Sequence, residues 1–226
     1  IVQVNIDIFL LLFLSLLVGV LSGLFGVGGG FLMTPFLIFM GIPPVYAVPN
    51  EVNNILATSV SGSLTHWFKN TLDYKMGIMI VAGGVVGTFL GITAFTYFDG
   101  IGKISVIISL LYMYLLAIVG TLMLIEALRT ATQKKAIKKK LHDHNWLQGL
   151  PLRMRFQKSR LYESALTPIL LGLIVGFVAA MMGIGGAFLM VPAMIYIVGM
   201  PVKLIPGTSL FVTIFISAIV PVLHSF

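Results

Sequence analysis

The stretch GVGGGFLMTP, residues 26–35, returns almost unchanged as GIGGAFLMVP at residues 183–192, and this repeat decides the fold. The two stretches match without a gap, and a one-residue insertion brings the following Gly/Pro turns into alignment. That register pairs Gly41 with Gly199, Pro43 with Pro201, Asn50 with Thr208, Ser59 with Ser217 and His66 with His224. A shared apolar bias does not match glycines, prolines and polar residues in this way. The chain therefore contains two homologous units.

The composition places these units in a lipid bilayer. Apolar residues make up 58% of the 226 residues before the 24 glycines are counted, and charged residues only 9%. A soluble domain carries about 25% charged residues. The mean hydropathy of +1.07 agrees with a membrane protein. The chain has no cysteine, which excludes disulfides and thiolate-bound metals.

The positive charge is confined to one loop. Ten of the 14 lysines and arginines lie between Arg129 and Arg160, so the net charge of +7 belongs to that loop. Basic loops between membrane spans stay in the cytoplasm. Nucleic-acid binding needs a basic face on a folded module, which this pattern does not provide. We expect a multi-pass protein of the bacterial inner membrane whose macromolecular surroundings are lipid, with no nucleic-acid partner.

Apolar runs of roughly 20 residues are required to span a bilayer. They predict an all-α, polytopic helix bundle, with helices at residues 8–25, 31–40, 51–68, 76–98, 104–125, 166–182, 189–198 and 208–226. We divide the chain into a first membrane repeat (residues 6–126), a basic cytoplasmic loop (127–164) and a second membrane repeat (165–226). The second repeat lacks about two helices of the first. We interpret the chain as a truncated piece of a longer protein rather than as a lopsided molecule.

The direction of the first two helices decides how the repeats are related. If residues 8–40 cross the membrane once, the two repeats are parallel. If they enter and return as a hairpin at the glycines, the N-terminus is outside and the repeats are inverted. No lysine or arginine precedes Lys69, which favours an outside N-terminus. We therefore favour inverted repeats.

The duplicated glycine runs predict helix interruptions inside the membrane. Helices are broken there only where protein or a wet cavity satisfies the backbone, and paired breaks in two halves point to a transporter's binding site. Gly28, Gly29 and Gly30 in the first unit, with Gly185 and Gly186 in the second, would present backbone N–H groups to an anion. The alternative is that these glycines only allow close helix packing. We assign that packing role to GGVVGTFLG, residues 83–91.

Polar side chains follow each Gly/Pro turn. Asn50 and Asn54 lie on one face of the first unit's helix, and Thr208 and Ser209 occupy the matching helix start in the second. Neutral donors can recognise an oxyanion without holding it as tightly as lysine or arginine. The alternative is ordinary hydrogen bonding between helices, and this alternative applies most strongly to Thr213 and Ser217.

Three ionisable side chains deserve separate assignments. Glu51 is the only carboxylate within the apolar architecture, and it is either a proton-coupling group or a carboxylate satisfied at a helix start. His66 and His224 occupy equivalent positions and could titrate near neutrality. Because His66 lies beside Trp67 and Lys69, we interpret it instead as an interfacial anchor. We expect no metal site, no catalytic residues and no cofactor.

The two glycine signatures and the turns that follow them resemble the TauE/SafE family of sulfite exporters, also called 4-toluene sulfonate uptake permeases. The best-matching stretches are GLFGVGGGFLMTPFLIFMGIPP and MMGIGGAFLMVPAMIYIVGMP, followed by GTSL. The resemblance implies a duplicated bundle of about eight spans, and secondary transport of sulfite, organosulfonates and related sulfur oxyanions. The Asn50-Glu51 pair stands where the second unit has Thr208-Ser209, an asymmetry that leaves the coupling residue open.

The sequence thus predicts a transporter rather than an enzyme, moving a small sulfur-containing anion such as sulfite or sulfoacetate by alternating access. An intramembrane enzyme is a second hypothesis, for which only Ser209 and His224 suggest a nucleophile and base. An anion channel is a third. The expected partners are the small anionic substrate and the lipid bilayer, and the pattern is compatible with a homo-oligomer.

Overall fold

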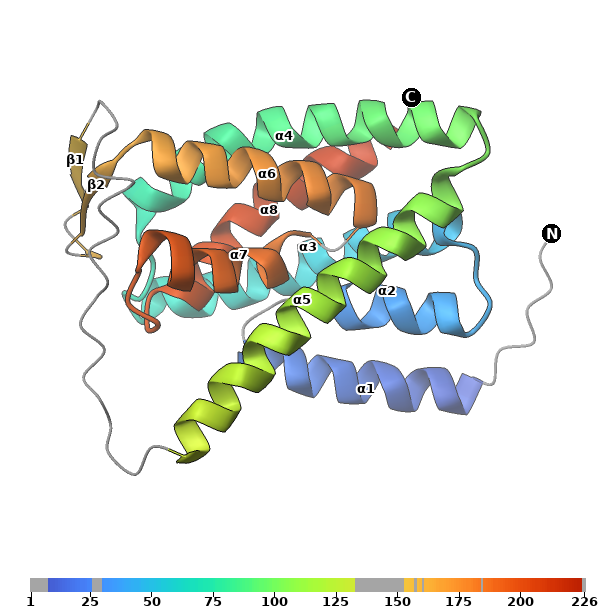
Figure 1. The fold of residues 1–226 in the computed structure, drawn as a ribbon, viewed down its shortest axis with the longest axis horizontal. Helices are drawn as coiled ribbons and strands as arrows, with labels where there is room; N and C mark the ends of the chain where they lie inside the picture. The colour runs from blue at the N-terminus through green and yellow to red at the C-terminus, as the bar shows by residue number, and fades with distance from the viewer. Residues whose placement is uncertain are drawn as a thin grey trace.

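The computed structural model describes residues 8–25, 30–132, 153–156, 158–159, 161–183 and 185–224. In chain order its elements are α1 (Ile8–Phe25), α2 (Gly30–Phe39), α3 (Pro44–Phe68), α4 (Tyr74–Gly100), α5 (Ile104–Thr132), β1 (Arg153–Phe156), β2 (Leu161–Ser164), α6 (Leu166–Met182), α7 (Ala187–Ala193), the π-helical turn η1 (Met194–Val198) and α8 (Ile205–His224). The described part of the chain is therefore mostly helical, as the apolar runs predict (Figure 1).

The helices suit a membrane environment. The α4 helix and residues Ile104–Thr121 of α5 are each long and apolar enough to cross a bilayer, and α6, the α7–η1 segment and α8 are shorter apolar helices. Large apolar side chains remain exposed on the outside of the bundle, including Phe9 at 83% and Phe39 at 86%. Exposed apolar surface on this scale is typical of a face that contacts lipid.

Two helix ends differ most from the sequence prediction, by seven residues each, and both differences have local reasons. The α3 helix begins at Pro44 rather than Glu51, because proline at a first helical position fits the required φ and loses no hydrogen bond. The α5 helix continues past Ile125 to Thr132, since no glycine or proline ends it there. The hairpin of β1 and β2, antiparallel, lies inside the basic loop and was not predicted.

The α4 and α6 helices pack against each other through glycines. A methyl group on Gly83 or Gly87 would collide with the main-chain carbonyl of Ile169 or Leu173, and one on Gly172 with that of Ile80. Residue numbers rise together along both helices, so they run parallel, side by side (Figure 1). Small residues let helix backbones approach closely in membranes. The packing role predicted for residues 83–91 is thus confirmed.

The α3 and α8 helices form a second pair of opposite direction. A methyl group on Gly62 would meet the side chain of Leu210, and one on Gly207 would meet His66. Residue numbers therefore rise along α3 as they fall along α8, and the two helices run antiparallel. We call this contact the α3–α8 seam.

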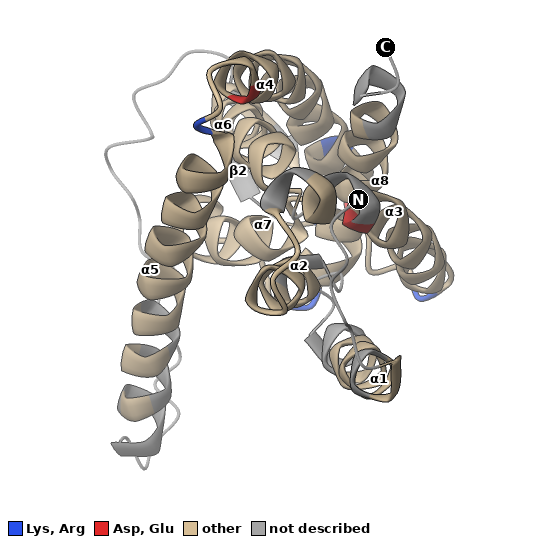
Figure 2. Cartoon of the chain, turned by 90° about the vertical axis from the view of Figure 1, so that its right-hand side faces the viewer, with Lys and Arg blue, Asp and Glu red and all other residues tan. Residues whose placement is uncertain are grey.

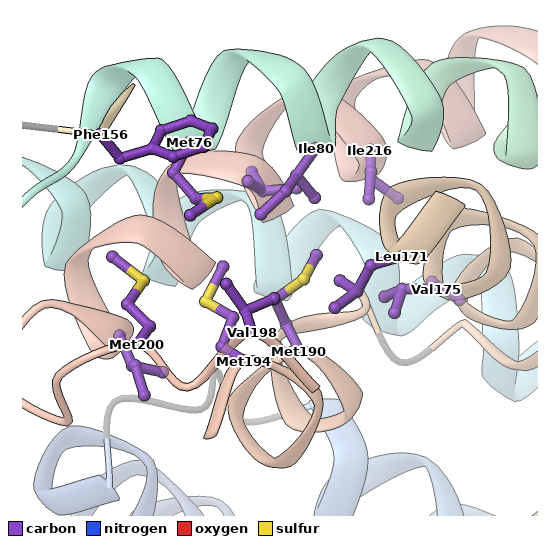
Figure 3. Packing of buried hydrophobic residues seen from close by; sticks show 13 residues of the cluster. Met76, Ile80, Phe156, Leu171, Val175, Met190, Met194, Val198, Met200 and Ile216 are labelled. Atoms are coloured by element: carbon purple, nitrogen blue, oxygen red, sulfur yellow. The ribbon is translucent and has the colours of Figure 1, made fainter. Parts of the chain in front are cut away.

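The α6 and α7 helices form a hairpin. Met182 at the end of α6 packs with Val48, Phe95 and Tyr112. Met194, in the turn that follows α7, packs instead with Met76 and Phe156 near the start of α4 (Figure 3). The chain therefore returns after Gly186 toward the end of the bundle from which α6 started. The α6 helix is about 26 Å long, which is less than the roughly 30 Å thickness of the hydrocarbon layer. We therefore expect the turn that follows it to lie within the membrane.

The first two helices are arranged alike in outline. The α1 helix lies beside α2, and α2 ends near the side of the molecule where α1 begins before the chain enters α3 (Figure 1). The α2 helix and the α7–η1 segment are each followed closely by a glycine with positive φ, Gly41 at +89° and Gly199 at +67°. A proline stands two residues after each glycine. Glycine in this conformation ends a helix without strain.

Charged residues are sparse on the helices (Figure 2). Lys69 and Lys75 lie at the α3–α4 junction, Lys158 contacts the same junction, and Lys203 precedes α8, whose Thr208 is bonded to Asp73 there. We call this the basic end of the bundle. Among lysines whose side chains are described, Lys103 alone lies at the opposite end, where α4 meets α5.

Candidate functional site

The glycine turn between α6 and α7 is built from left-handed backbone. Gly183, Gly185 and Gly186 have φ of +68°, +68° and +80°, a region that residues with a Cβ rarely adopt. Ile184 lies outside the described residues. All three glycines are buried. The sequence repeat thus marks a turn that only glycine can form at these positions.

Neighbouring helices cover this turn. A methyl group on Gly183 would meet the side chain of Val48 on α3 at 2.5 Å, and one on Gly186 the side chain of Val175 at 3.0 Å. A methyl group on Gly185 would collide with Ile55 of α3 and lie 3.2 Å from Oγ of Ser217 on α8. In this conformation the turn sits against the α3–α8 seam, with Ile55 directly over Gly185.

A tyrosine that the sequence analysis did not select holds the end of α6. The hydroxyl of Tyr112, on α5, donates to the carbonyl oxygen of Met182 at 2.8 Å, and Thr34 of α2 is its further hydrogen-bonding partner. Tyr112 is 5% exposed. A buried phenol needs a polar partner, so a tyrosine inside an apolar span was the signal that could have revealed this contact.

Glu51 lies in the same region, on the second turn of α3. Its side chain is 5% exposed and is close enough to Tyr112 for the two to interact electrostatically. Asn54 Nδ2 donates to Glu51 Oε1 at 3.5 Å, at the long limit of a hydrogen bond. No lysine or arginine is buried among the described side chains. A charged Glu51 would therefore be buried without a countercharge, which is costly.

Thr208 and Ser209 are buried at the start of α8, and their hydroxyls have protein partners. Thr208 Oγ1 donates to the carbonyl oxygen of Leu204 at 2.8 Å and accepts from the backbone N–H of Asp73 at 3.2 Å. Ser209 Oγ donates to the carbonyl oxygen of Pro206 at 3.1 Å. Both hydroxyls stabilise the first turn of α8 in this conformation.

Other predicted site residues fall partly outside the described set. Gly28 and Gly29 lie outside it, Gly30 is the first residue of α2, and the side chain of Asn50, within α3, is not described. The side chain of His224 is likewise outside it. The structure therefore places Glu51 between Val48 and Ile55, the α3 residues that meet the turn, leaves the side chain of Asn54 exposed, and places Thr208 and Ser209 at the basic end.

The basic end contains a buried carboxylate that the sequence analysis also passed over. Asp73 is 3% exposed and caps α4 by accepting from the N–H of Met76. Its other oxygen accepts from the N–H and hydroxyl of Ser159, in the turn between β1 and β2. Lys158 Nζ donates to the carbonyl oxygen of Leu72. An aspartate just before an apolar run is a helix-start signal, so this cap was predictable.

His66 lies at this same end. Its Nδ1 and the hydroxyl of Thr71 are hydrogen-bonded at 2.8 Å, and its neighbour Trp67 is 54% exposed and packs edge-on against Tyr74. Among the described residues no group of three or more His, Cys, Asp or Glu side chains could hold a metal ion.

Comparison with known proteins places the chain in a family. The family model described as sulfite exporter TauE/SafE matches residues 11–225. The chain is 30% identical over 201 residues to the "Probable membrane transporter protein YjnA" of Bacillus subtilis, covering 88% of this chain and 72% of that protein. It is 29% identical over 218 residues to the "Probable membrane transporter protein YunE" of the same organism, covering 92% and 74%.

The similarity extends to a further organism. The chain is 28% identical over 190 residues to the "Probable membrane transporter protein MJ0441" of Methanocaldococcus jannaschii, covering 81% of this chain and 60% of that protein. No solved structure matches the chain. The family match covers nearly the whole sequence, and relatives that align over most of this chain are named as probable membrane transporters. The protein therefore belongs to the TauE/SafE sulfite exporter family, whose members are membrane proteins of the transporter class.

Proposed function

We propose that this protein is a secondary transporter that moves a small sulfur-containing anion, such as sulfite, sulfoacetate or another organosulfonate, by alternating access. The observation that supports this most is the placement of the α6–α7 turn, which ends inside the bundle against the seam of α3 and α8. Interrupted helices that meet at the middle of a duplicated bundle are characteristic of substrate sites in such transporters.

We propose that the two repeats are inverted. The repeat equates α3 with α8, and these helices run antiparallel. Two equivalent helices of opposite direction imply that their units enter the membrane from opposite sides. The proposal keeps the division of the chain into residues 6–126, 127–164 and 165–226. It also places the basic end in the cytoplasm of a bacterial cell, because the lysines gather there.

The substrate would reach the turn when α3 moves away from it. Ile55 now covers Gly185, so the N–H groups near Gly185 and Gly186 become accessible only if the α3–α8 seam opens on one side. Gly28, Gly29 and Gly30, with Asn50, would serve the same purpose in the first unit. Movement of the seam about the covered turn is the alternating step that we propose.

Glu51 is the proton-coupling residue in this proposal. Glu51 is buried, and no buried cation neutralises its carboxylate among the described side chains. The charged carboxylate repels an incoming anion, so the anion binds more readily when Glu51 is protonated. Asn54, which donates to Glu51, helps to hold the deprotonated form after the anion leaves. Thr208 and Ser209 would contact the anion from α8 once the first turn of that helix rearranges.

Flux measurements test the function directly. The full-length protein in proteoliposomes should take up labelled sulfite, sulfoacetate or taurine in a saturable way, and protein-free liposomes should not. An inside-alkaline pH gradient should accelerate uptake. If none of the three anions moves faster than in protein-free liposomes, the proposed function is wrong. Single-channel currents in place of slow, saturable flux would also contradict it.

The coupling role of Glu51 has its own test. Glu51→Gln should abolish the acceleration by the pH gradient, while downhill flux continues. Asp99→Asn is the matched control, because Asp99 is an exposed carboxylate at the end of α4. Retention of the full gradient effect in Glu51→Gln would exclude Glu51 as the coupling group.

A further inference from the structure

Two buried serine hydroxyls stand out among the polar groups of the helices. Hydroxyls inside a helix usually donate to the carbonyl one turn earlier. Thr58 does so to Asn54 at 3.0 Å, Thr88 to Gly84 at 2.8 Å and Thr213 to Ser209 at 2.9 Å. The hydroxyls of Ser59 and Ser217 are fully buried and have no hydrogen-bond partner.

The unpaired hydroxyls of Ser59 and Ser217 are energetically costly in this conformation. Leaving a buried polar group unpaired costs its full desolvation free energy, and a helix always offers a carbonyl that would remove the cost. Among the described side chains, Thr167 is the only other buried hydroxyl without a partner, and it lies in the first turn of α6 at the basic end. The unpaired hydroxyls of Ser59 and Ser217 are therefore candidates for binding a ligand.

The two serines share one contact surface. The contacts of Gly62 with Leu210 and of Gly207 with His66 set the register of the α3–α8 seam. This register places Ser59 opposite Thr213, so Ser59 and Ser217 are offset by about one helical turn, roughly 6 Å along the seam. They occupy equivalent positions in the repeated sequence. Each unit thus contributes one unpaired hydroxyl near the centre of the seam.

The glycine turn lies directly beside this surface. Ser217 Oγ would be 3.2 Å from a methyl group on Gly185, so the hydroxyl faces the turn with no side chain between them. Gly185 is also where Ile55, one helical turn before Ser59, covers the turn. The unpaired hydroxyls therefore border the region through which the proposed substrate would pass.

We propose that Ser59 and Ser217 form a paired donor subsite that binds oxygen atoms of the transported anion as it occupies the middle of the bundle. This proposal rests on the proposed transport function and adds the residues that recognise the substrate. Their free O–H groups are donors, and no lysine or arginine is buried among the described side chains. Two equivalent donors match a sulfite or sulfonate group, which has several equivalent oxygen atoms.

The chemistry of the seam favours an anion over a cation. A sodium site needs several oxygen acceptors, which transporters supply from unwound backbone. Ser59 and Ser217 lie within the continuous helices α3 and α8, which supply no unwound backbone at this level. The seam offers hydroxyl groups here, whose O–H hydrogens are free to donate. Neutral donors of this kind bind an anion weakly enough to release it.

The experiment compares Ser59→Ala, Ser217→Ala and the double variant with the wild type, as full-length protein in proteoliposomes and in detergent. We expect each single variant to raise KM for the transported anion about tenfold, and the double variant to raise it further. The melting temperature of the ligand-free variants should equal or exceed that of the wild type, because an unpaired hydroxyl is removed. Ser61→Ala, an exposed serine on the same helix, is the control and should change neither quantity.

A second readout separates this proposal from the transport function. Sulfite, sulfoacetate or taurine should raise the melting temperature of the wild type, and the double variant should lose this shift. Wild-type flux with unchanged KM in both variants overturns the serine subsite and leaves transport standing. A wild type without flux whose anion-induced shift is lost in the double variant supports the subsite and overturns transport. A wild type with neither flux nor shift overturns both.

Two further results would overturn the subsite. A marked fall in melting temperature for Ser59→Ala and Ser217→Ala would mean that the hydroxyls have a structural role. A change in sodium dependence, with KM for the anion unaltered, would mean that the pair binds a cation.

Discussion

The bundle contains two helix pairs whose contact surfaces are built from different groups. The α4–α6 pair is parallel, and its glycines rest against main-chain carbonyls of the partner helix. The α3–α8 pair is antiparallel, and across it Gly62 meets the side chain of Leu210 and Gly207 that of His66, although Gly207 also meets the main-chain carbonyl of Thr71 beyond the end of α3; unpaired serine hydroxyls lie between the two helices. Backbone against backbone leaves no room for adjustment, whereas side chains can change rotamer. The first pair is built as a fixed scaffold and the second as a contact that can rearrange.

The largest effect should come from adding volume to the scaffold. In Gly87→Leu the new side chain would collide with the main-chain carbonyl of Leu173, which cannot move without separating the helices. We expect a loss of at least the roughly 3 kcal/mol that marks the upper range of overpacking, seen as aggregation in size-exclusion chromatography. Gly120→Leu is the control, because Gly120 on α5 faces open space. Folded, monodisperse Gly87→Leu protein would contradict the fixed-scaffold interpretation.

A larger residue in the turn beside the seam should be tolerated better than one in the scaffold. Shortening the side chain that it meets should restore part of the lost stability. Gly185→Ala collides with a side chain, that of Ile55, and must also adopt positive φ, which costs about 1–2 kcal/mol. We expect the double variant Gly185→Ala/Ile55→Ala to show a coupling of about 1 kcal/mol or more relative to the single variants, because the collision disappears. Thermal unfolding in detergent measures it. Strict additivity would show that Ile55 does not cover Gly185.

The two pairs also differ in how well the sequence revealed them. The glycine spacing of residues 83–91 and the repeat identified both the scaffold and the turn, because those positions tolerate only glycine. Partner choice was not visible, because Gly83 meets Ile169, which lies far from it in the sequence. The roles of Tyr112 and Asp73 were missed, since each depends on a distant backbone group. Thr208, selected for an anion, is bonded to Leu204 and Asp73 in this conformation.

An effect smaller than that on the scaffold is expected where the two pairs are joined at the basic end. Asp73→Ala removes the acceptor of the Ser159 hydroxyl and N–H and of the Met76 N–H, leaving buried donors unpaired. We expect a loss of about 2–3 kcal/mol. Asp99→Ala, at an exposed position, should lower the melting temperature by much less. Equal losses for the two variants would mean that the hairpin of β1 and β2 does not hold the start of α4.

The smallest effect should come from the contact that holds the turn beside the seam. Tyr112→Phe deletes the neutral hydrogen bonds of the Tyr112 hydroxyl, that to the carbonyl oxygen of Met182 and that with Thr34, and keeps the ring packed. The loss should be about 1–2 kcal/mol. Tyr114→Phe, an exposed tyrosine on the same helix, should change stability by less than about 0.5 kcal/mol. Because Met182 ends α6 immediately before Gly183, hydrogen exchange at the turn should increase in Tyr112→Phe while α4 keeps its protection. Unchanged exchange at the turn would show that the glycine backbone holds its own conformation and that the seam moves against a rigid hairpin.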